Sequence, residues 1–450
     1  MVRVTDMTHG RPIRLILLFS LPLMLGSVFQ QLYTIVDTII IGRGVGMQAL
    51  ASIGAADWIN WLVLWGLQGF TQGFAILAAQ EFGAGAYDRL RRVLAMIVKL
   101  SCWFGIAVTI ISLLLVRPLL TLLRTDPAVF GGAQTYLYVQ FGGSLIIIAY
   151  NMAAAVLRCL GDSRTPLLAI LAASFANIAL DLLFVMGFGW GIFGASFATV
   201  LAQLIAFLLC LRSLRRLPFV QLTKADWKTD PAILLHLCRL GIPTGLQMSM
   251  ITLGGMVLQS VLNGFGVVFV AGYTAANKLY GILESASVAF GYAMTAYMGQ
   301  NRGARNAARI DAGIRAVLVL SIGFTAAIVA TMLLAGKPLL GLFLSTEEAG
   351  TADALAVAHR YLMVLMAFLL ALFVLQAYRS SLQGLGEMTV PTLSGFAEML
   401  MRMGAALVLP AFIGQSGVFF AEGAAWVCAA ALNLVWYYMR IGKIKRELMQ

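Results

Sequence analysis

Charged residues are scarce in this sequence of 450 residues. Asp, Glu, Lys and Arg make up only 11% of it, whereas hydrophobic residues make up 61%, and the mean hydropathy is +0.90. A soluble domain is about 25% charged and about 45–50% apolar, so too little polar surface is available here to cover a water-soluble fold. The composition therefore excludes the soluble, disordered and collagen-like classes and predicts an integral membrane protein.

Residues that hold metals or build disulfide frameworks are also few. The five cysteines are scattered without a Cys-x-x-Cys pair, and the three histidines lie far apart in the chain. These spacings do not match a structural metal site or a disulfide scaffold. The sequence also has no Gly-x4-Gly-Lys-Ser/Thr phosphate loop, no recognisable Ser/His/Asp arrangement and no His-Glu-x-x-His motif. We therefore expect neither an enzyme nor an ATPase, and no cofactor apart from a driving ion.

Long apolar runs, in contrast, are plentiful. A helix needs about 20 apolar residues to cross about 30 Å of hydrocarbon. Only helices and closed barrels satisfy their backbone hydrogen bonds in lipid, and no alternating strand pattern is present, so we predict an all-α membrane protein. Twelve runs are long enough: 13–41, 49–80, 93–116, 133–157, 166–188, 191–211, 240–262, 270–299, 312–335, 360–383, 391–413 and 418–440.

The basic residues are distributed unevenly between the two sides of the membrane. Of the 31 Lys and Arg residues, 24 fall in the two tails and the even-numbered loops, with Arg3 and Arg379 among them, and five fall on the opposite side. The other two, Lys278 and Arg402, lie inside predicted spans. Because basic residues accumulate on the cytoplasmic side, both termini are expected in the cytoplasm. Topology thus explains the net charge of +12, and we expect no nucleic-acid partner.

The chain repeats itself at an offset of about 220 residues. Residues 80–84 (Gln-Glu-Phe-Gly-Ala) return as 300–304 (Gln-Asn-Arg-Gly-Ala), and 160–162 (Leu-Gly-Asp) return as 385–387 (Leu-Gly-Glu). Each half holds six predicted spans, so the halves cross the membrane in the same orientation, as parallel repeats do in transporters. We predict an N-lobe at 1–211, a cytoplasmic linker at 212–238 and a C-lobe at 239–450.

Four polar residues in the first half share one depth in the membrane. Ionisable residues inside a span are costly and mark functional candidates. Asp37 and Asp181 both fall in the outer half of the bilayer, and Asn177 lies one turn before Asp181 on the same helix face. Thr199 lies about 12 Å below the outer surface. Two neighbouring carboxyl groups cannot both ionise cheaply in a low dielectric, so we expect this group to bind H⁺ or Na⁺. The alternative is simple hydrogen bonding across helices.

The second half carries another candidate pair. Glu398 and Arg402 are four residues apart with the acid first, which favours an ion pair within one helix. We expect this pair to be structural, with a gating role as the alternative. Asp57, Lys278 and Glu284 also fall within predicted spans, with Asp57 near the outer interface, but the sequence identifies no partner for them.

Several stretches together resemble the multidrug and toxic compound extrusion (MATE) family of secondary antiporters. They include Leu21-Pro22, 30–33 (Gln-Gln-Leu-Tyr), 36–38 (Val-Asp-Thr), 160–162 and 383–386 (Gln-Gly-Leu-Gly), and the resemblance covers essentially the whole chain. It implies two six-helix lobes in a V shape that export organic cations in exchange for H⁺ or Na⁺. Residue by residue, it places the N-lobe cation site of the family at Asp37, Asn177, Asp181 and Thr199, and the bend of helix 1 at Pro22.

The resemblance does not extend to a cation site in the C-lobe. One branch of the family has acids on helices 7 and 10, where this sequence has Gln247, Gln259, Gln376 and Arg379. At an offset of 225, the positions equivalent to Asn177 and Asp181 are Arg402 and Ala406, which favours a site in one lobe. The expected partners are small organic cations and the lipid bilayer.

Two other functions stay open at the level of sequence. A lipid-linked oligosaccharide flippase of the same superfamily would need several basic residues around its cavity, and only Lys278 and Arg402 are available. The other alternative is a channel or a non-transporting membrane scaffold. In each case we expect a monomer in the plasma (inner) membrane of a bacterium.

Overall fold

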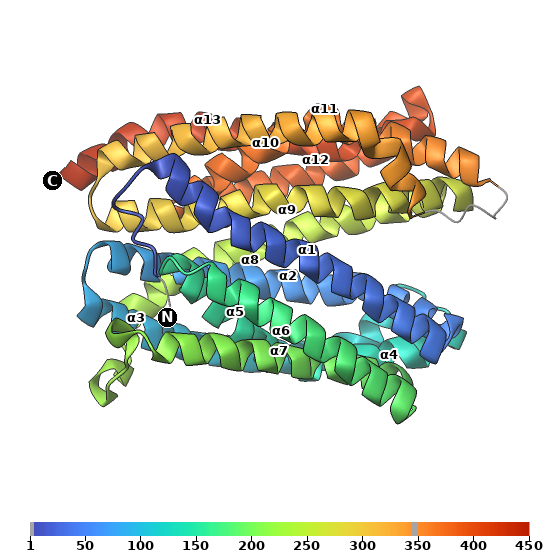
Figure 1. Cartoon of the computed structure of the whole chain (residues 1–450), viewed down its shortest axis with the longest axis horizontal. Helices are drawn as coiled ribbons and strands as arrows, with labels where there is room; N and C mark the ends of the chain where they lie inside the picture. The colour runs from blue at the N-terminus through green and yellow to red at the C-terminus, as the bar shows by residue number, and fades with distance from the viewer. Residues whose placement is uncertain (1–3, 344–349, 450) are drawn as a thin grey trace. The chain divides into compact units, whose positions relative to one another are not determined.

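The part of the chain that the structure describes is built from helices. The computed structural model describes residues 4–343 and 350–449, and every regular element in these ranges is helical (Figure 1). A helix pairs its backbone N–H and C=O groups within one segment, which is what a lipid environment demands. Arg3, counted in the charge bias, and the outermost residues of the predicted lobes lie outside the described residues.

Seven α-helices in the first half correspond to the six spans predicted there. The helices are α1 (Pro12–Gly44), α2 (Met47–Gly83), α3 (Tyr87–Leu122), α4 (Pro127–Gly142), α5 (Ser144–Cys159), α6 (Arg164–Asp181) and α7 (Gly191–Arg215). A π-helical segment, η1 (Leu182–Gly187), extends α6. The helix α1 runs without interruption through Pro22, the residue at which a bend was expected.

The predicted span 133–157 is not one continuous helix. It is divided at Gly143 into α4 and α5, which are bent by 50° relative to each other. Gly-Gly-Ser at 142–144 is a sequence at which helices bend readily. A Cβ atom on Gly143 would lie 2.5 Å from Val200 Cγ2, so the glycine also lets α7 approach the break closely. The break therefore depends on packing as well as on local propensity.

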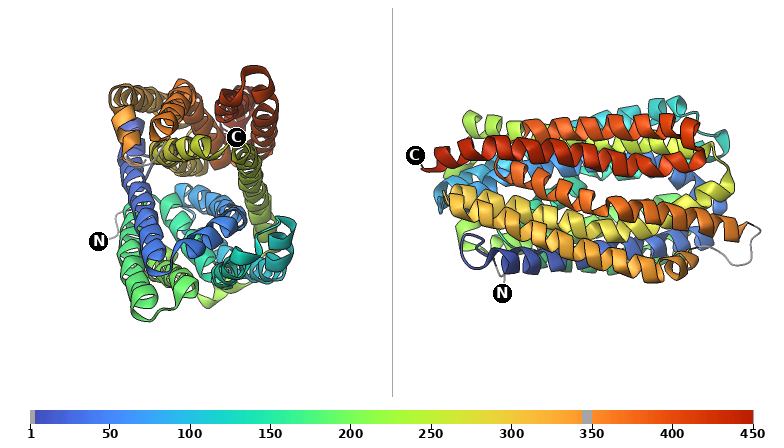
Figure 2. Two further views of the ribbon diagram at one scale, coloured as in Figure 1. Left: turned by 90° about the vertical axis from the view of Figure 1, so that its right-hand side faces the viewer. Right: turned by 90° about the horizontal axis from the view of Figure 1, so that it is seen from above.

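Six α-helices make up the second half. They are α8 (Pro231–Asn263), α9 (Val267–Gly303), α10 (Ala307–Gly341), α11 (Thr351–Gly384), α12 (Thr389–Ile413) and α13 (Phe420–Met449). Three short 3₁₀ helices lie in the connections: η2 (Pro218–Val220), η3 (Lys224–Trp227) and η4 (Gln415–Phe419). Seen end-on, α9 to α13 run side by side (Figure 2, left).

Ten described helices are long and apolar enough to cross a membrane, and the α4–α5 pair brings the number to eleven. The helix α9 completes the twelve spans predicted from the sequence. It is 37 residues long, but much of its surface is buried by other helices, so it does not need an apolar residue at every position. The chain is an all-α, multi-pass membrane protein.

The helices form two compact units. The N-terminal unit contains residues 4–6 and Leu21–Gly245, and the C-terminal unit contains Met7–Ser20 and the chain from Leu246 onward. The division thus falls inside α1 and inside α8, whereas the sequence placed it in the linker. In the N-terminal unit, α2 packs against the first part of α8 through glycine. A Cβ atom on Gly73 would lie only 2.6 Å from Gly241 Cα.

Met7–Ser20 is held in the C-terminal unit by buried polar contacts. The Met7 N–H donates to Gln300 Oε1 at 2.8 Å. Arg309 donates to the carbonyl oxygens of Met7 at 2.9 Å and Gly10 at 2.8 Å. Ile16 is fully buried as well. These contacts explain why the start of α1 belongs to the second half of the fold.

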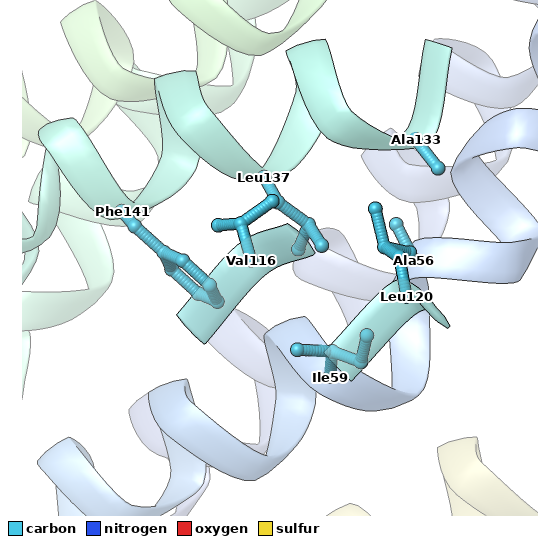
Figure 3. Close-up of a cluster of buried hydrophobic side chains, with 7 residues drawn as sticks. All are labelled: Ala56, Ile59, Val116, Leu120, Ala133, Leu137 and Phe141. Atoms are coloured by element: carbon cyan, nitrogen blue, oxygen red, sulfur yellow. The ribbon is translucent and has the colours of Figure 1, made fainter. Parts of the chain in front are cut away.

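A hydrophobic cluster holds α2, α3 and α4 together in the N-terminal unit. Its buried side chains are Ala56, Ile59, Val116, Leu120, Ala133, Leu137 and Phe141 (Figure 3). Ala56 directly precedes Asp57 and Ile59 directly precedes Asn60 on α2, so the cluster fixes the helix segment that carries those two polar side chains.

Candidate functional site

Asp37 and Asp181 meet inside the N-terminal unit. Asp37 lies on α1 and is half-buried, whereas Asp181 is the last residue of α6 and is fully buried. Their carboxyl groups lie within hydrogen-bonding reach of each other. The structure thus brings together the two acids that the sequence placed at one depth.

The other two predicted residues, Asn177 and Thr199, lie beside Asp181. With its amide oriented to satisfy both neighbours, Asn177 donates to Asp181 Oδ2 at 3.2 Å and accepts from the Thr199 backbone N–H at 3.3 Å. The Thr199 hydroxyl donates to the Ala195 carbonyl oxygen at 3.2 Å, which leaves its oxygen lone pairs able to face an ion.

The turn between α6 and α7 sets the position of Asp181. After Asp181 the helix widens into η1, and π-helical segments of this kind are frequent at functional sites. The connection to α7 needs positive φ at Gly189 (+68°) and Gly191 (+56°), which glycine adopts without strain. Gly194 then lets α7 approach Phe184 of η1 closely.

Apolar side chains surround this group. Ile40, Ile41, Ala49, Val185 and Ala195 form a buried cluster, and Val36 and Ile178 pack against it. Val36 precedes Asp37 directly, and Ile178 follows Asn177 directly. The surroundings therefore supply a low dielectric, in which interactions between charges are strong.

The acid pair has unused hydrogen-bonding capacity. Oδ1 of Asp37 and Oδ1 of Asp181 are both buried and have no hydrogen-bond partner among the described residues. Two carboxylates in contact repel each other strongly unless a proton or a cation lies between them. The arrangement can therefore bind H⁺, and the oxygens of Thr199 and the two carboxyl groups could also contribute to a Na⁺ shell.

A small cavity continues from this group along α6 and α7. Its volume is about 30 Å³, which is room for about two water molecules. The lining side chains include Gln30, Tyr33, Tyr150, Ser174, Asn177, Thr199 and Gln203. Ser174 Oγ and Gln203 Oε1 are buried there without a partner in the described part of the chain, so the cavity is suited to water or to an ion.

The structure adds Asp57 to the neighbourhood of the acid pair. Asp57 is half-buried on α2 and within electrostatic range of Asp37, whereas its place in the sequence, near the outer interface, indicates no partner. Tyr136 lies close to both acids and accepts a hydrogen bond from Asn60 at 3.2 Å. The sequence contained a signal for this placement: Asp57 and Thr199 each lie eight residues from the outer start of their predicted spans, which puts them at the same depth in the membrane.

The predicted pair of Glu398 and Arg402 is part of a larger network in the C-terminal unit. Glu398 Oε1 lies 3.1 Å from Arg402 Nη2, and Glu398 Oε2 lies 2.5 Å from Arg379 Nη2. Arg402 also binds Glu422 at 2.8 Å. Arg379, predicted from the sequence to lie in a cytoplasmic loop, is buried in α11. Its burial reflects this ion pair and reduces the basic bias by one residue.

The chain thus combines two units of helices with a pair of carboxyl groups in contact inside one of them. The MatE family model matches the chain twice, at residues 22–183 and 243–408, with the two matches starting 221 residues apart. The chain belongs to the MATE family. Proteins of this family are membrane transporters rather than enzymes, and the double match agrees with the internal repeat.

Relatives of this chain match along nearly its whole length. A Bacillus subtilis protein named "Probable multidrug resistance protein YpnP" is 32% identical over 455 residues, covering 99% of this chain and 98% of the relative. The multidrug export protein MepA of Staphylococcus saprophyticus is 22% identical, covering 94% and 93%.

Solved structures of MATE proteins share the fold. The crystal structure of a MATE protein in complex with MaL6 superposes with a TM-score of 0.90 at 25% identity, covering 99% of this chain and all of that one. The outward-facing conformation of a multidrug resistance MATE transporter has a TM-score of 0.90 at 25% identity, with 99% of both chains covered.

Proposed function

We propose that the chain is a secondary active antiporter that exports organic cations and drugs across the plasma membrane in exchange for H⁺ or Na⁺. The observation that carries this proposal is the contact between Asp37 and Asp181 in an apolar part of the N-terminal unit. Relatives named as multidrug resistance and multidrug export proteins support the class of substrate.

The acid pair is the element that couples the ion to transport. With an ion bound, the charge of the pair is reduced and the two carboxyl groups can stay in contact. When the ion leaves, the repulsion between carboxylates favours separation of α1 from α6. Asn177 keeps Asp181 oriented throughout, since its amide bridges Asp181 and the Thr199 backbone. Ion binding therefore acts on the position of α1.

Cationic substrates suit the charges of the N-terminal unit. Asp37, Asp57 and Asp181 are gathered there, and Tyr33 and Tyr136 lie beside them. Carboxylates and aromatic faces are the groups that recognise organic cations. A flippase for anionic headgroups would instead need free basic residues, and Arg402 is buried and engaged by two glutamates. The charge distribution favours the drug antiporter over the flippase.

The orientation of the chain in the membrane and its oligomeric state are proposed from the sequence and from the number of units in one chain. We place both termini in the cytoplasm because of the distribution of Lys and Arg. We also propose that one chain is the working unit, since a single chain carries both units of the fold.

Transport into proteoliposomes tests the proposal. Uptake of a fluorescent organic cation is measured under an imposed proton gradient and, separately, under an imposed sodium gradient. We expect uptake to require one of these gradients, and Asp181→Asn to abolish it. Asp88→Asn is the matched control, because the Asp88 side chain is 86% exposed. Full gradient-dependent uptake by Asp181→Asn would contradict the proposal.

A further inference from the structure

The C-terminal unit contains a second group of buried and half-buried ionisable side chains, which we call the C-terminal charge cluster. It consists of the carboxyl groups of Glu284, Glu398 and Glu422 and the guanidinium groups of Arg379 and Arg402. Glu284 lies on α9, Arg379 on α11, Glu398 and Arg402 on α12, and Glu422 on α13. Glu422, Arg402 and Glu398 are within electrostatic range of Glu284.

Two of the three carboxyl groups already have arginine partners. Arg379 binds Glu398 at 2.5 Å, and only 4% of each side chain is exposed. Arg402 donates to Glu422 Oε2 from both Nε (3.1 Å) and Nη2 (2.8 Å), and its Nη1 donates to the Ile251 carbonyl oxygen at 3.0 Å. The two arginines therefore balance two glutamates.

The third carboxyl group, that of Glu284, has no cation of its own. None of the ion pairs found among the described residues includes Glu284. The basic residue nearest to it in sequence, Lys278, is exposed. At 100° per residue, six residues place Lys278 on a different face of α9. With every group ionised, the cluster would carry one uncompensated negative charge.

The hydroxyl group of Tyr280 lies beside the carboxyl group of Glu284. Tyr280 lies one turn earlier on α9, and its hydroxyl is within hydrogen-bonding reach of the Glu284 carboxyl. The Tyr280 ring stacks on Trp426, with ring centroids 5.5 Å apart, and both rings are buried. Glu284 itself is only half-buried, so a proton can reach it. The site thus places a hydroxyl group, held by ring stacking, beside a partly exposed carboxyl group.

We propose that Glu284 is a second proton-binding site of this transporter, separate from the acid pair of the N-terminal unit. An uncompensated charge inside a membrane protein is strongly disfavoured, and a proton on Glu284 makes the charge cluster neutral. A proton fits the geometry better than a metal cation. The described residues include no group of three or more His, Cys, Asp or Glu side chains arranged to hold a metal ion.

Protonation of Glu284 switches the net charge of the cluster between zero and −1. In the neutral state, Arg379 and Arg402 each keep their own glutamate. In the charged state, Glu284 repels Glu422 and attracts Arg402, so Glu284 competes with Glu422 for the guanidinium group of Arg402. Proton binding at Glu284 therefore acts on the contacts between α12 and α13.

Infrared difference spectroscopy of the full-length protein in liposomes tests this directly. A protonated carboxyl group has a C=O stretching band that a carboxylate lacks and that shifts in D₂O. Spectra recorded at acid and alkaline pH should contain such a band in the wild type. The component of the band that belongs to Glu284 should be absent from Glu284→Gln and present in Asp181→Asn, because the acid pair of the other unit gives a separate component. This readout does not depend on transport, so it stays informative if the antiport proposal fails.

Further variants keep the test decisive. Tyr280→Phe removes the hydroxyl beside Glu284 and should shift the same band, and Glu284→Asp should also shift it. These two variants replace Glu284→Gln if that variant does not fold. A wild-type spectrum from Glu284→Gln, or an unshifted band in Tyr280→Phe, would overturn the proposal.

Discussion

Glu422 accepts two hydrogen bonds from Arg402 through a single oxygen, Oε2, from Nε and from Nη2. The same arginine also binds Glu398, one turn earlier on α12. One guanidinium group thus joins α12 to α13 and satisfies two buried carboxyl groups.

Removal of this guanidinium group should destabilise the protein. Arg402→Ala leaves Glu422 without an arginine partner and Glu398 with Arg379 alone. Removing one partner of a buried pair costs about 3–5 kcal/mol. We expect a lower folded yield and a lower melting temperature in detergent, with transport per folded molecule largely retained. Lys443→Ala is the control, because Lys443 pairs with Glu447 only at 3.9 Å on the surface. Normal stability with abolished transport would show that the network serves gating instead.

Asp37 and Asp181 should behave as one unit in mutagenesis. Asp37→Asn and Asp181→Asn each remove a charge that must be gained and lost in every cycle. Each single variant should therefore lose gradient-driven efflux, and the double variant should be little worse than either, since residues in one site are not additive. Dye efflux from proteoliposomes measures all three. Partial coupling in Asp37→Asn would mean that Asp37 only positions α1.

Two glycines of α2 should respond to alanine in opposite directions. A Cβ atom on Gly73 would lie 2.6 Å from Gly241 Cα and from the Leu240 carbonyl oxygen, whereas nothing lies within 4 Å of one on Gly54. Gly73→Ala should destabilise the protein by about 1–3 kcal/mol through overpacking. Gly54→Ala should stabilise it by up to about 1 kcal/mol through helix propensity. Thermal unfolding of the two variants gives the comparison, and equal shifts would argue against close packing of α2 on α8.

Acid should loosen the linker between the two halves at Asp226. Burial alone would raise the pKa of Asp226. Hydrogen bonds from the Thr223 N–H (2.8 Å) and hydroxyl (2.7 Å), together with the charges of Arg91 and Arg92, have the larger effect, so the pKa lies below its usual value. A lowered folded pKa contributes stability that is complete above the unfolded value of about 4 and is lost as the pH falls through the folded value.

The pH dependence at Asp226 can be measured by amide hydrogen exchange. Exchange around residues 223–227 should be slower in the wild type than in Asp226→Asn at neutral pH, and the difference should vanish in strong acid. Asp353→Asn, which removes an exposed acid at the start of α11, should leave these amides unchanged. A difference between wild type and Asp226→Asn that persists in strong acid would refute the role of the ionised carboxyl group.

Features with a regular period were predictable from the sequence. Apolar runs located all twelve membrane helices, because each span needs a minimum length whatever its neighbours are. Counting residues from the membrane surface placed Asp37 and Asp181 at one depth, and the structure brings them together. Regular helix geometry makes depth additive along the chain, so two residues far apart in sequence could be compared.

Features that depend on a tertiary partner were not predictable. Arg379 was assigned to a loop because the acid that keeps it buried, Glu398, lies 19 residues away on another helix. Glu422 was not singled out, although it binds Arg402 across 20 residues. The break at Gly143 reflects the approach of Val200, which is 57 positions further along. Local patterns carry no information on such contacts.

The acids of the two candidate proton sites are not related by the internal repeat. The repeat equivalents of Asp37 and Asp181, at offsets of 221 and 225, are Leu258 and Ala406, and the equivalent of Glu284, at 220, is Leu64. None of these three acids is therefore matched by an acid at the equivalent position, so the ionisable groups at these positions diverged after the ancestral six-helix unit was doubled. The two copies of the six-helix scaffold thus carry their ionisable groups at different positions, and a change at one of these sites has no counterpart in the other half.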